Sequence, residues 1–126
     1  MKDGKFVILC VDDDSDILES LKLVLEANGY IMASAPTAEE GLEVFQAEKP
    51  DLLIVDLMME EIDAGTRFVK DLQALGNTAP IYMLSSVGDE LHQSIDAGKL
   101  GLAGIFQKPI DPDVLLATLK TKLRKA

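Results

Sequence analysis

Short apolar runs alternate with amphipathic segments along the whole chain. Apolar residues recur at helical spacing between the runs, as at Ile17, Leu21 and Leu25. The short apolar runs themselves are typical of strands that are buried on both faces of a parallel sheet. Strands that alternate with helices predict the α/β class, with helices covering both faces of the sheet. The five runs are 6–11, 30–35, 52–55, 81–84 and 105–107.

Five helices are expected between and after these strands. Asp14 or Ser15 is suited to cap the first, and Thr37 with Glu40 forms a capping box for the second. The second helix is expected to bury Leu42 and Phe45. The third is expected to bury Phe68, Val69, Leu72 and Leu75, and the fourth covers 89–100. Asp111 and Pro112 begin the last, in which Val114, Leu115, Leu119 and Leu123 have helical spacing.

Length and composition narrow the class of protein. A chain of 126 residues fits one domain, taken here as 1–126, with a real hydrophobic core. The formal net charge of −10 argues against non-specific binding to nucleic acid or to an anionic membrane. The single Cys10 lies in an apolar run and predicts a core thiol in a reducing, cytoplasmic setting. No run approaches the ~18 apolar residues of a membrane-spanning helix.

Polar side chains follow four of the predicted strands, and parallel strands end at one edge of the sheet. Asp12 and Asp13 follow the first strand, Asp56 the third, Ser85 and Ser86 the fourth, and Lys108 the fifth. Two carboxylates about 5 Å apart repel by roughly 3 kcal/mol at an effective dielectric constant near 20. Three together require a cation or raised pKa values. Mg²⁺ fits such oxygen ligands, and a carboxylate, a hydroxyl and an ammonium beside it are suited to hold a phosphoryl group.

Two other kinds of site contain an acidic run similar to that at 12–16. A calcium-binding EF-hand loop that starts at Asp12 needs glycine at its sixth position and glutamate at its twelfth, where the sequence has Ile17 and Leu23. A phosphohydrolase similar to the haloacid dehalogenases also has Asp-x-Asp after a strand. Such enzymes need a second acidic cluster, however, and the later strands here end in Ser-Ser and Lys-Pro.

The ordered set VDD at 11–13, VDLMM at 55–59, LSS at 84–86 and QKPI at 107–110 resembles the receiver domain of two-component response regulators (CheY-like). The resemblance covers nearly the whole chain. It implies a flavodoxin-like doubly wound sheet of five parallel strands in the order 2-1-3-4-5, with five helices. It also implies that the chain is a Mg²⁺-dependent signalling switch and not an enzyme. Such a switch catalyses only its own phosphotransfer and its own slow dephosphorylation.

The same resemblance assigns roles to individual residues. Asp56 would accept the phosphoryl group from a histidine kinase or a phosphotransfer protein, and Asp12, Asp13, Asp56 and the Met58 carbonyl would hold Mg²⁺. Ser85 and Lys108 would contact the phosphoryl oxygens, and the Lys108–Pro109 bond is often cis in the family. A downstream partner, or a second copy of the chain in a homodimer, would bind the face formed by helix 4, strand 5 and helix 5. An interaction module that is never phosphorylated remains the alternative.

Several positions depart from the family pattern. Glu60 stands where proline is usual, and Ala64 looks inserted before Gly65. Ile105 stands where an aromatic switch residue is common, and Phe106 would point to the opposite face of the strand. Met58 and Val87, which would flank the hydrolytic water, are apolar and predict slow autodephosphorylation.

Overall fold

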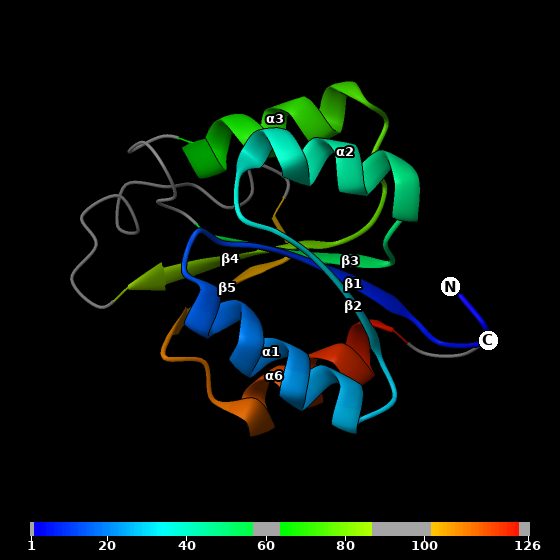
Figure 1. Ribbon diagram of the computed structural model, residues 1–126, viewed down its shortest axis with the longest axis vertical. Helices are drawn as coiled ribbons and strands as arrows, with labels where there is room; N and C mark the ends of the chain where they lie inside the picture. Colours follow the sequence, from blue (N-terminus) through cyan, green and yellow to red (C-terminus); the bar gives the residue numbers. More distant parts are fainter. Residues whose placement is uncertain (1, 57–63, 87–101, 124–126) are drawn as a thin grey trace.

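Five parallel strands form one sheet with helices on both faces (Figure 1). The structure is a computed structural model that describes residues 2–56, 64–86 and 102–123. The strand order is β2-β1-β3-β4-β5, as the sequence predicts by resemblance. The strands are β1 (Val7–Val11), β2 (Ile31–Ala35), β3 (Leu52–Asp56), β4 (Ile81–Ser86) and β5 (Gly104–Lys108).

Two helices cover each face of the sheet in the described part of the chain. Helices α2 and α3 lie on one face, and α1 and α6 lie on the other (Figure 1). The fourth expected helix, at 89–100, lies outside the described residues. The helices are α1 (Ser15–Ala27), α2 (Ala38–Glu48), α3 (Ala64–Ala74) and α6 (Pro112–Lys122).

The central strands are buried on both faces and divide the core into two layers. All five residues of β1 and all five of β3 are buried. Alternate residues of each strand therefore join different layers: Leu9 and Val55 pack under α2 and α3, whereas Ile8 and Ile54 pack under α1 and α6. This two-sided burial is the physical reason for the apolar runs in the sequence.

The predicted helix starts are confirmed. The side chain of Asp14 accepts a hydrogen bond from the Asp16 N–H, and Thr37 Oγ1 accepts one from the Glu40 N–H at 3.1 Å. Asp111 caps α6 in the same manner, with Pro112 in its first turn. The Asp14 cap follows Asp12 and Asp13 directly, and the Asp111 cap comes three residues after Lys108, so these two loops are held between a strand and a capped helix.

Some expected core positions lie at the surface. Val114 is 53% exposed on α6, and Leu75 is 45% exposed just beyond the end of α3. Helical spacing shows which face of a helix is apolar, but it does not decide whether a residue near the edge of that face is buried. Leu42 and Phe45 are only partly buried, since they pack at the margin of the layer under α2 and α3.

Candidate functional site

The polar residues after the strands meet at the carboxyl edge of the sheet. Strands β1 and β3 are neighbours, with Val11 opposite Val55, so Asp12 and Asp56 follow paired positions. The strand order reverses between these two strands, because β2 lies beyond β1 and β4 lies beyond β3. Such a switch point is the usual ligand site of an open α/β sheet.

Three carboxylates gather at this point. One oxygen from each of Asp12, Asp13 and Asp56 lies within 4.8 Å of the other two. Asp12 and Asp56 are buried, whereas Asp13 is exposed. The predicted acidic cluster is therefore confirmed as a spatial group, and it needs positive charge to be stable.

The acidic run divides into two parts with different roles. Asp12 Oδ1 accepts a hydrogen bond from the Asp14 N–H at 2.9 Å. Asp14 caps α1. Asp16 lies in the first turn of that helix, where its negative charge interacts favourably with the positive end of the helix dipole. Only Asp12 and Asp13 of the four carboxylates therefore belong to the cluster with Asp56.

Lys108 supplies the cation that the described residues bring to the cluster. Its Nζ lies 3.1 Å from Asp12 Oδ2 and 3.3 Å from Asp56 Oδ2. Burial alone lowers the pKa of Lys108, but its interactions with the carboxylates of Asp12 and Asp56 outweigh burial and raise the pKa above its ordinary value. Lys108 is therefore fully charged at neutral pH.

A divalent cation fits the remaining charge. The three carboxylates carry three negative charges against the one positive charge of Lys108. Asp12 Oδ2 is buried and its contact among the described residues is the ion pair with Lys108 Nζ at 3.1 Å, which leaves it short of hydrogen-bond donors. An underused buried oxygen among carboxylates is a suitable ligand for a hard ion such as Mg²⁺. Met58, the fourth expected ligand, lies outside the described residues.

The hydroxyl expected at the site is buried at the end of β4. Asp56 pairs with Leu84, so Ser85 lies one residue beyond the neighbour of Asp56. Ser85 is fully buried, and Ser86 pairs with Lys108 across β4 and β5. The ends of β3, β4 and β5 thus bring a carboxylate, a hydroxyl and an ammonium group to one edge.

Position 105, the switch position in β5, holds isoleucine instead of the usual aromatic residue, as the sequence predicts. Ile105 packs against the layer under α2 and α3, whereas Phe106 belongs to the layer under α1 and α6. The Phe106 ring contacts Tyr82 edge to face, with centroids 5.0 Å apart and an interplanar angle of 81°. Phe106 is therefore a core residue and does not take the place of an aromatic at position 105.

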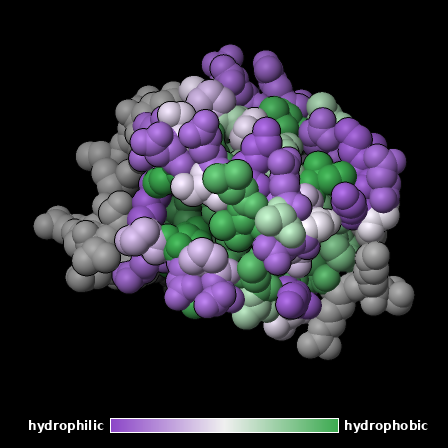
Figure 2. All heavy atoms as spheres, turned by 60° about the horizontal axis from the view of Figure 1, so that its bottom comes forward, coloured by the Kyte–Doolittle hydropathy of each residue, from purple (hydrophilic) through white to green (hydrophobic). Residues whose placement is uncertain are grey.

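A small apolar groove, which the sequence did not predict, adjoins the site. It has a volume of about 240 Å³ between α1 and the segment from β5 to α6, and Asp16 and Lys108 lie in its wall. Figure 2 shows apolar side chains gathered on this face. Its apolar lining includes Ile17, Val24 and Ile110, which come from both sides of the seam. The Lys108–Pro109 peptide bond in its wall is cis.

Comparison with known proteins identifies the family. The response regulator receiver domain matches residues 8–120 of the chain. The chain belongs to the response regulator receiver family. Members of this family are phosphoryl-accepting switches of two-component signal transduction.

Several relatives are similar over almost the whole chain. The alkaline phosphatase synthesis transcriptional regulatory protein PhoP of Bacillus subtilis is 34% identical over 94% of this chain, which corresponds to 49% of PhoP. The transcriptional regulatory protein GlrR of Escherichia coli is 33% identical over 94% of this chain and 26% of its own length. The chain therefore spans about a quarter to a half of these curated relatives.

Solved structures show the same fold. A response regulator structure from Chloroflexus aurantiacus superposes with a TM-score of 0.84 at 32% identity, covering 97% of this chain and 100% of that one. A CheY-like receiver domain from Methanospirillum hungatei gives the same TM-score and identity, covering 95% of this chain and 94% of that one.

Proposed function

We propose that Asp56 is the phosphoacceptor and that the chain acts as a phosphorylation-dependent switch. The observation that carries the proposal is the buried Asp56 carboxylate, held by Lys108 at 3.3 Å inside a cluster that also contains Asp12 and Asp13. The buried carboxylate oxygen of Asp56 would act as the nucleophile. The positive charge of Lys108 lies beside it and would neutralise the incoming phosphoryl oxygens.

The transfer step follows from the groups at the edge. An Asp56 carboxylate oxygen forms a bond to phosphorus while the bond from phosphorus to the donor nitrogen breaks. The bonding electrons stay on the imidazole of a histidine kinase or phosphotransfer protein, which then takes up a proton. Lys108 is in place to bind one phosphoryl oxygen, and Ser85, at the end of the adjacent strand, is assigned to another.

Mg²⁺ is the proposed cofactor. Asp12, Asp13 and Asp56 would hold it together with the Met58 carbonyl, and when bound it would neutralise the phosphoryl charge. The underused Asp12 Oδ2 supports this assignment. The chain catalyses only its own phosphorylation and dephosphorylation in this proposal, and it works in the cytoplasm.

The groove beside Lys108 is the proposed contact surface for the phosphodonor protein. A donor must bring its histidine to the carboxyl edge, and this groove is continuous with the site through Asp16 and Lys108. Apolar side chains of the donor would fill the groove, and basic ones would meet the exposed carboxylate of Asp16 in its wall. The face that carries Val114, on α6 beside β5, is the proposed contact for a downstream partner or a second copy.

Intact mass after incubation with Mg²⁺ and acetyl phosphate tests the proposal. We expect a gain of one phosphoryl group that requires Mg²⁺ and is absent in Asp56→Asn. Asp14→Asn is the matched control, because it removes a neighbouring carboxylate outside the cluster and asparagine caps a helix equally well. If no condition gives phosphorylation of the folded wild-type protein, the chain is the unphosphorylated interaction module instead.

A further inference from the structure

The dipeptide Asn28–Gly29 joins α1 to β2 at the amino edge of the sheet, which is the edge opposite the acidic cluster (Figure 1). Both residues are exposed. Glycine has no side chain to hinder its backbone nitrogen as it approaches the side-chain carbonyl carbon of the preceding asparagine. The backbone is therefore well placed in sequence to attack this side-chain amide. The chain has one other asparagine, Asn77, which precedes the β-branched Thr78.

The closed end of α1 engages both of the groups that would react. Asn28 Nδ2, the nitrogen that would leave, donates a hydrogen bond to the Val24 carbonyl at 2.7 Å. The Gly29 N–H, whose nitrogen would attack, donates one to the Glu26 carbonyl at 3.3 Å. Gly29 has φ 85°, the left-handed conformation that commonly ends a helix. While these bonds persist, two different carbonyls hold the two nitrogens, and the reaction is opposed.

This helix end is nevertheless easy to open. The Gly29 hydrogen bond of 3.3 Å is longer than an ordinary N–H···O bond, and its donor residue is exposed. The last turn of α1 contains no basic residue to offset the negative end of the helix dipole. Leu25 is fully buried, so an opening that begins at Gly29 is stopped there by the core. Such local openings release both nitrogens without unfolding the protein.

We propose that Asn28 is a site of spontaneous deamidation and that local opening of the end of α1 sets its rate. In the open form the Gly29 nitrogen gives up its proton to hydroxide and bonds to the side-chain carbonyl carbon of Asn28. The bond from that carbon to Nδ2 breaks, and the nitrogen takes up a proton and leaves as ammonia. Water then opens the resulting five-membered succinimide ring, and the product is aspartate or isoaspartate.

The product fits the helix end less well than asparagine does. A carboxylate has no N–H to donate to the Val24 carbonyl, and it adds negative charge where the last carbonyls of α1 point. Isoaspartate also lengthens the backbone by one atom shortly before β2. The bond from the Ile31 N–H to the Phe6 carbonyl begins the pairing of that strand with β1. Deamidation therefore destabilises the junction of α1 with the edge strand of the sheet.

The alternative is that the end of α1 opens only when the whole protein unfolds. Asn28 would then be no more than a helix cap. The two cases differ in what speeds the reaction. A change that loosens the end of α1 does so in the first case, whereas any loss of global stability does so in the second.

Mass spectrometry of the tryptic peptide that begins at Leu23 follows the reaction, because that peptide contains no asparagine besides Asn28. The full chain is incubated at mildly alkaline pH, both native and in denaturing urea, and deamidation adds one mass unit. We expect the native rate to be about ten- to a hundredfold below the unfolded rate, whereas global unfolding would protect by a factor of ~10³ or more. Asn77 is the internal control. Its amide exchanges two 3.0 Å hydrogen bonds with the Ala79 backbone, so it should not react in the native protein.

Three variants separate local from global opening. Glu26→Gly should react at Asn28 about fivefold faster than Glu26→Ala, the equivalent of the ~1 kcal/mol by which glycine disfavours a helix relative to alanine. Ala47→Gly, at the corresponding position near the end of α2, lowers global stability similarly and should leave the rate at Asn28 unchanged. Three results would overturn the proposal: no deamidation of the native protein while the unfolded chain reacts, equal rates in the two Glu26 variants, or an equal acceleration in Ala47→Gly.

Discussion

Replacing Asp56 by asparagine should stabilise the metal-free protein, although it removes an ion pair. The attraction between Lys108 and Asp56 at 3.3 Å amounts to ~5 kcal/mol at an effective dielectric constant of 20. The repulsion of Asp56 by Asp12 at 4.8 Å or less is at least ~3.5 kcal/mol on the same scale. Asp13 contributes a similar repulsion, which exposure to solvent reduces by about half.

The electrostatic gains and losses of this substitution nearly cancel, and burial decides the sign. Asp56 is only 5% exposed, so its charged form has lost most of its hydration. Asparagine is neutral and retains an oxygen that Lys108 is able to contact. We therefore expect Asp56→Asn to raise the free energy of unfolding by about 1–2 kcal/mol in the absence of metal.

Urea unfolding in EDTA and in saturating Mg²⁺ measures this effect. Mg²⁺ at a hundred times its dissociation constant should stabilise the wild type by ~2.7 kcal/mol and leave the asparagine variant nearly unchanged. Asp14→Asn again serves as the control for a general loss of negative charge. A variant that is clearly less stable than the wild type in EDTA would refute the reasoning, since the ion pair would then outweigh repulsion and burial together.

Other substitutions test separate parts of the structure. Lys108→Met should abolish phosphorylation by acetyl phosphate, measured by intact mass, and should leave the fold intact when Mg²⁺ is present. The raised pKa of Lys108 means that its contribution to stability is complete below about pH 10.5 and is lost as pH rises through the still higher folded value. The difference in urea midpoint between wild type and Lys108→Met should therefore be constant from neutral pH to pH ~9 and change only in the alkaline range. Met58→Asn with Val87→Glu should speed the decay of the phosphorylated form, followed by mass; an unchanged decay would contradict the role given to the two apolar side chains. Gly41→Ala should lower the free energy of unfolding by about 1–3 kcal/mol despite the better helix propensity of alanine, because its Cβ would lie 3.0 Å from Phe68 and 3.1 Å from Val11. A thermal midpoint equal to that of the wild type would show instead that the Phe68 ring is able to move aside.

The acidic site was predictable because each of its residues lies at the carboxyl end of a strand or just after it. Apolar runs reveal where parallel strands end, and a parallel sheet brings those ends to one edge. Asp12, Asp56 and Lys108 therefore meet in space although they are far apart in the sequence. The sequence does not show that Lys108 contacts both Asp12 and Asp56, since such distances depend on side-chain conformation.

The amphipathic pattern was less reliable at the margins of helices. Val114 and Leu75 have the correct spacing for burial, yet both are largely exposed. Val114 lies in the first turn of α6 and Leu75 lies just beyond the end of α3, so both are at the end of a helix, where the spacing of apolar residues does not decide burial. The sequence contains no signal for where a covering layer stops.

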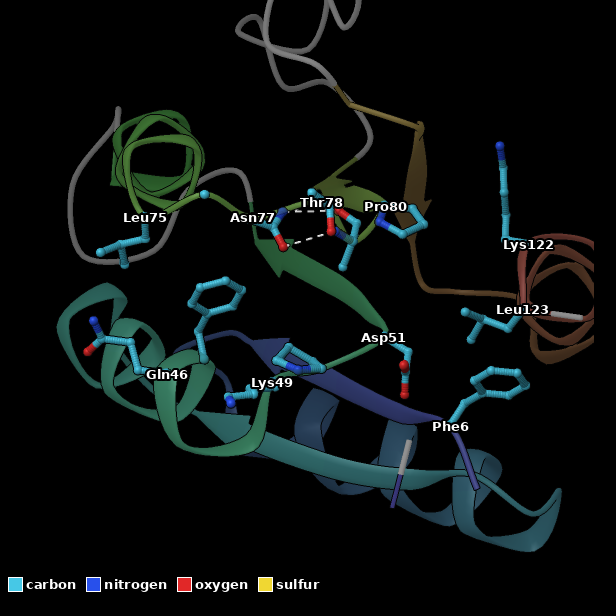
Figure 3. Close-up of a pocket in the computed structure, with 14 residues that line it drawn as sticks. Phe6, Gln46, Lys49, Asp51, Leu75, Asn77, Thr78, Pro80, Lys122 and Leu123 are labelled. Atoms are coloured by element: carbon cyan, nitrogen blue, oxygen red, sulfur yellow. Dashed lines mark hydrogen bonds between the residues drawn. The ribbon is translucent and has the colours of Figure 1, made fainter. Parts of the chain in front are cut away.

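A cavity of about 720 Å³ at the amino edge of the sheet (Figure 3) could not be predicted for a related reason. Its wall is assembled from positions such as Phe6, Lys49, Leu75 and Lys122, which share no motif and follow or precede different elements. The ends of helices meet at this edge, just as the loops after the strands meet at the other. Each edge of the sheet thus gathers residues from distant parts of the chain, but only the carboxyl edge has a sequence signature, because a charged residue after a buried strand interrupts an apolar run.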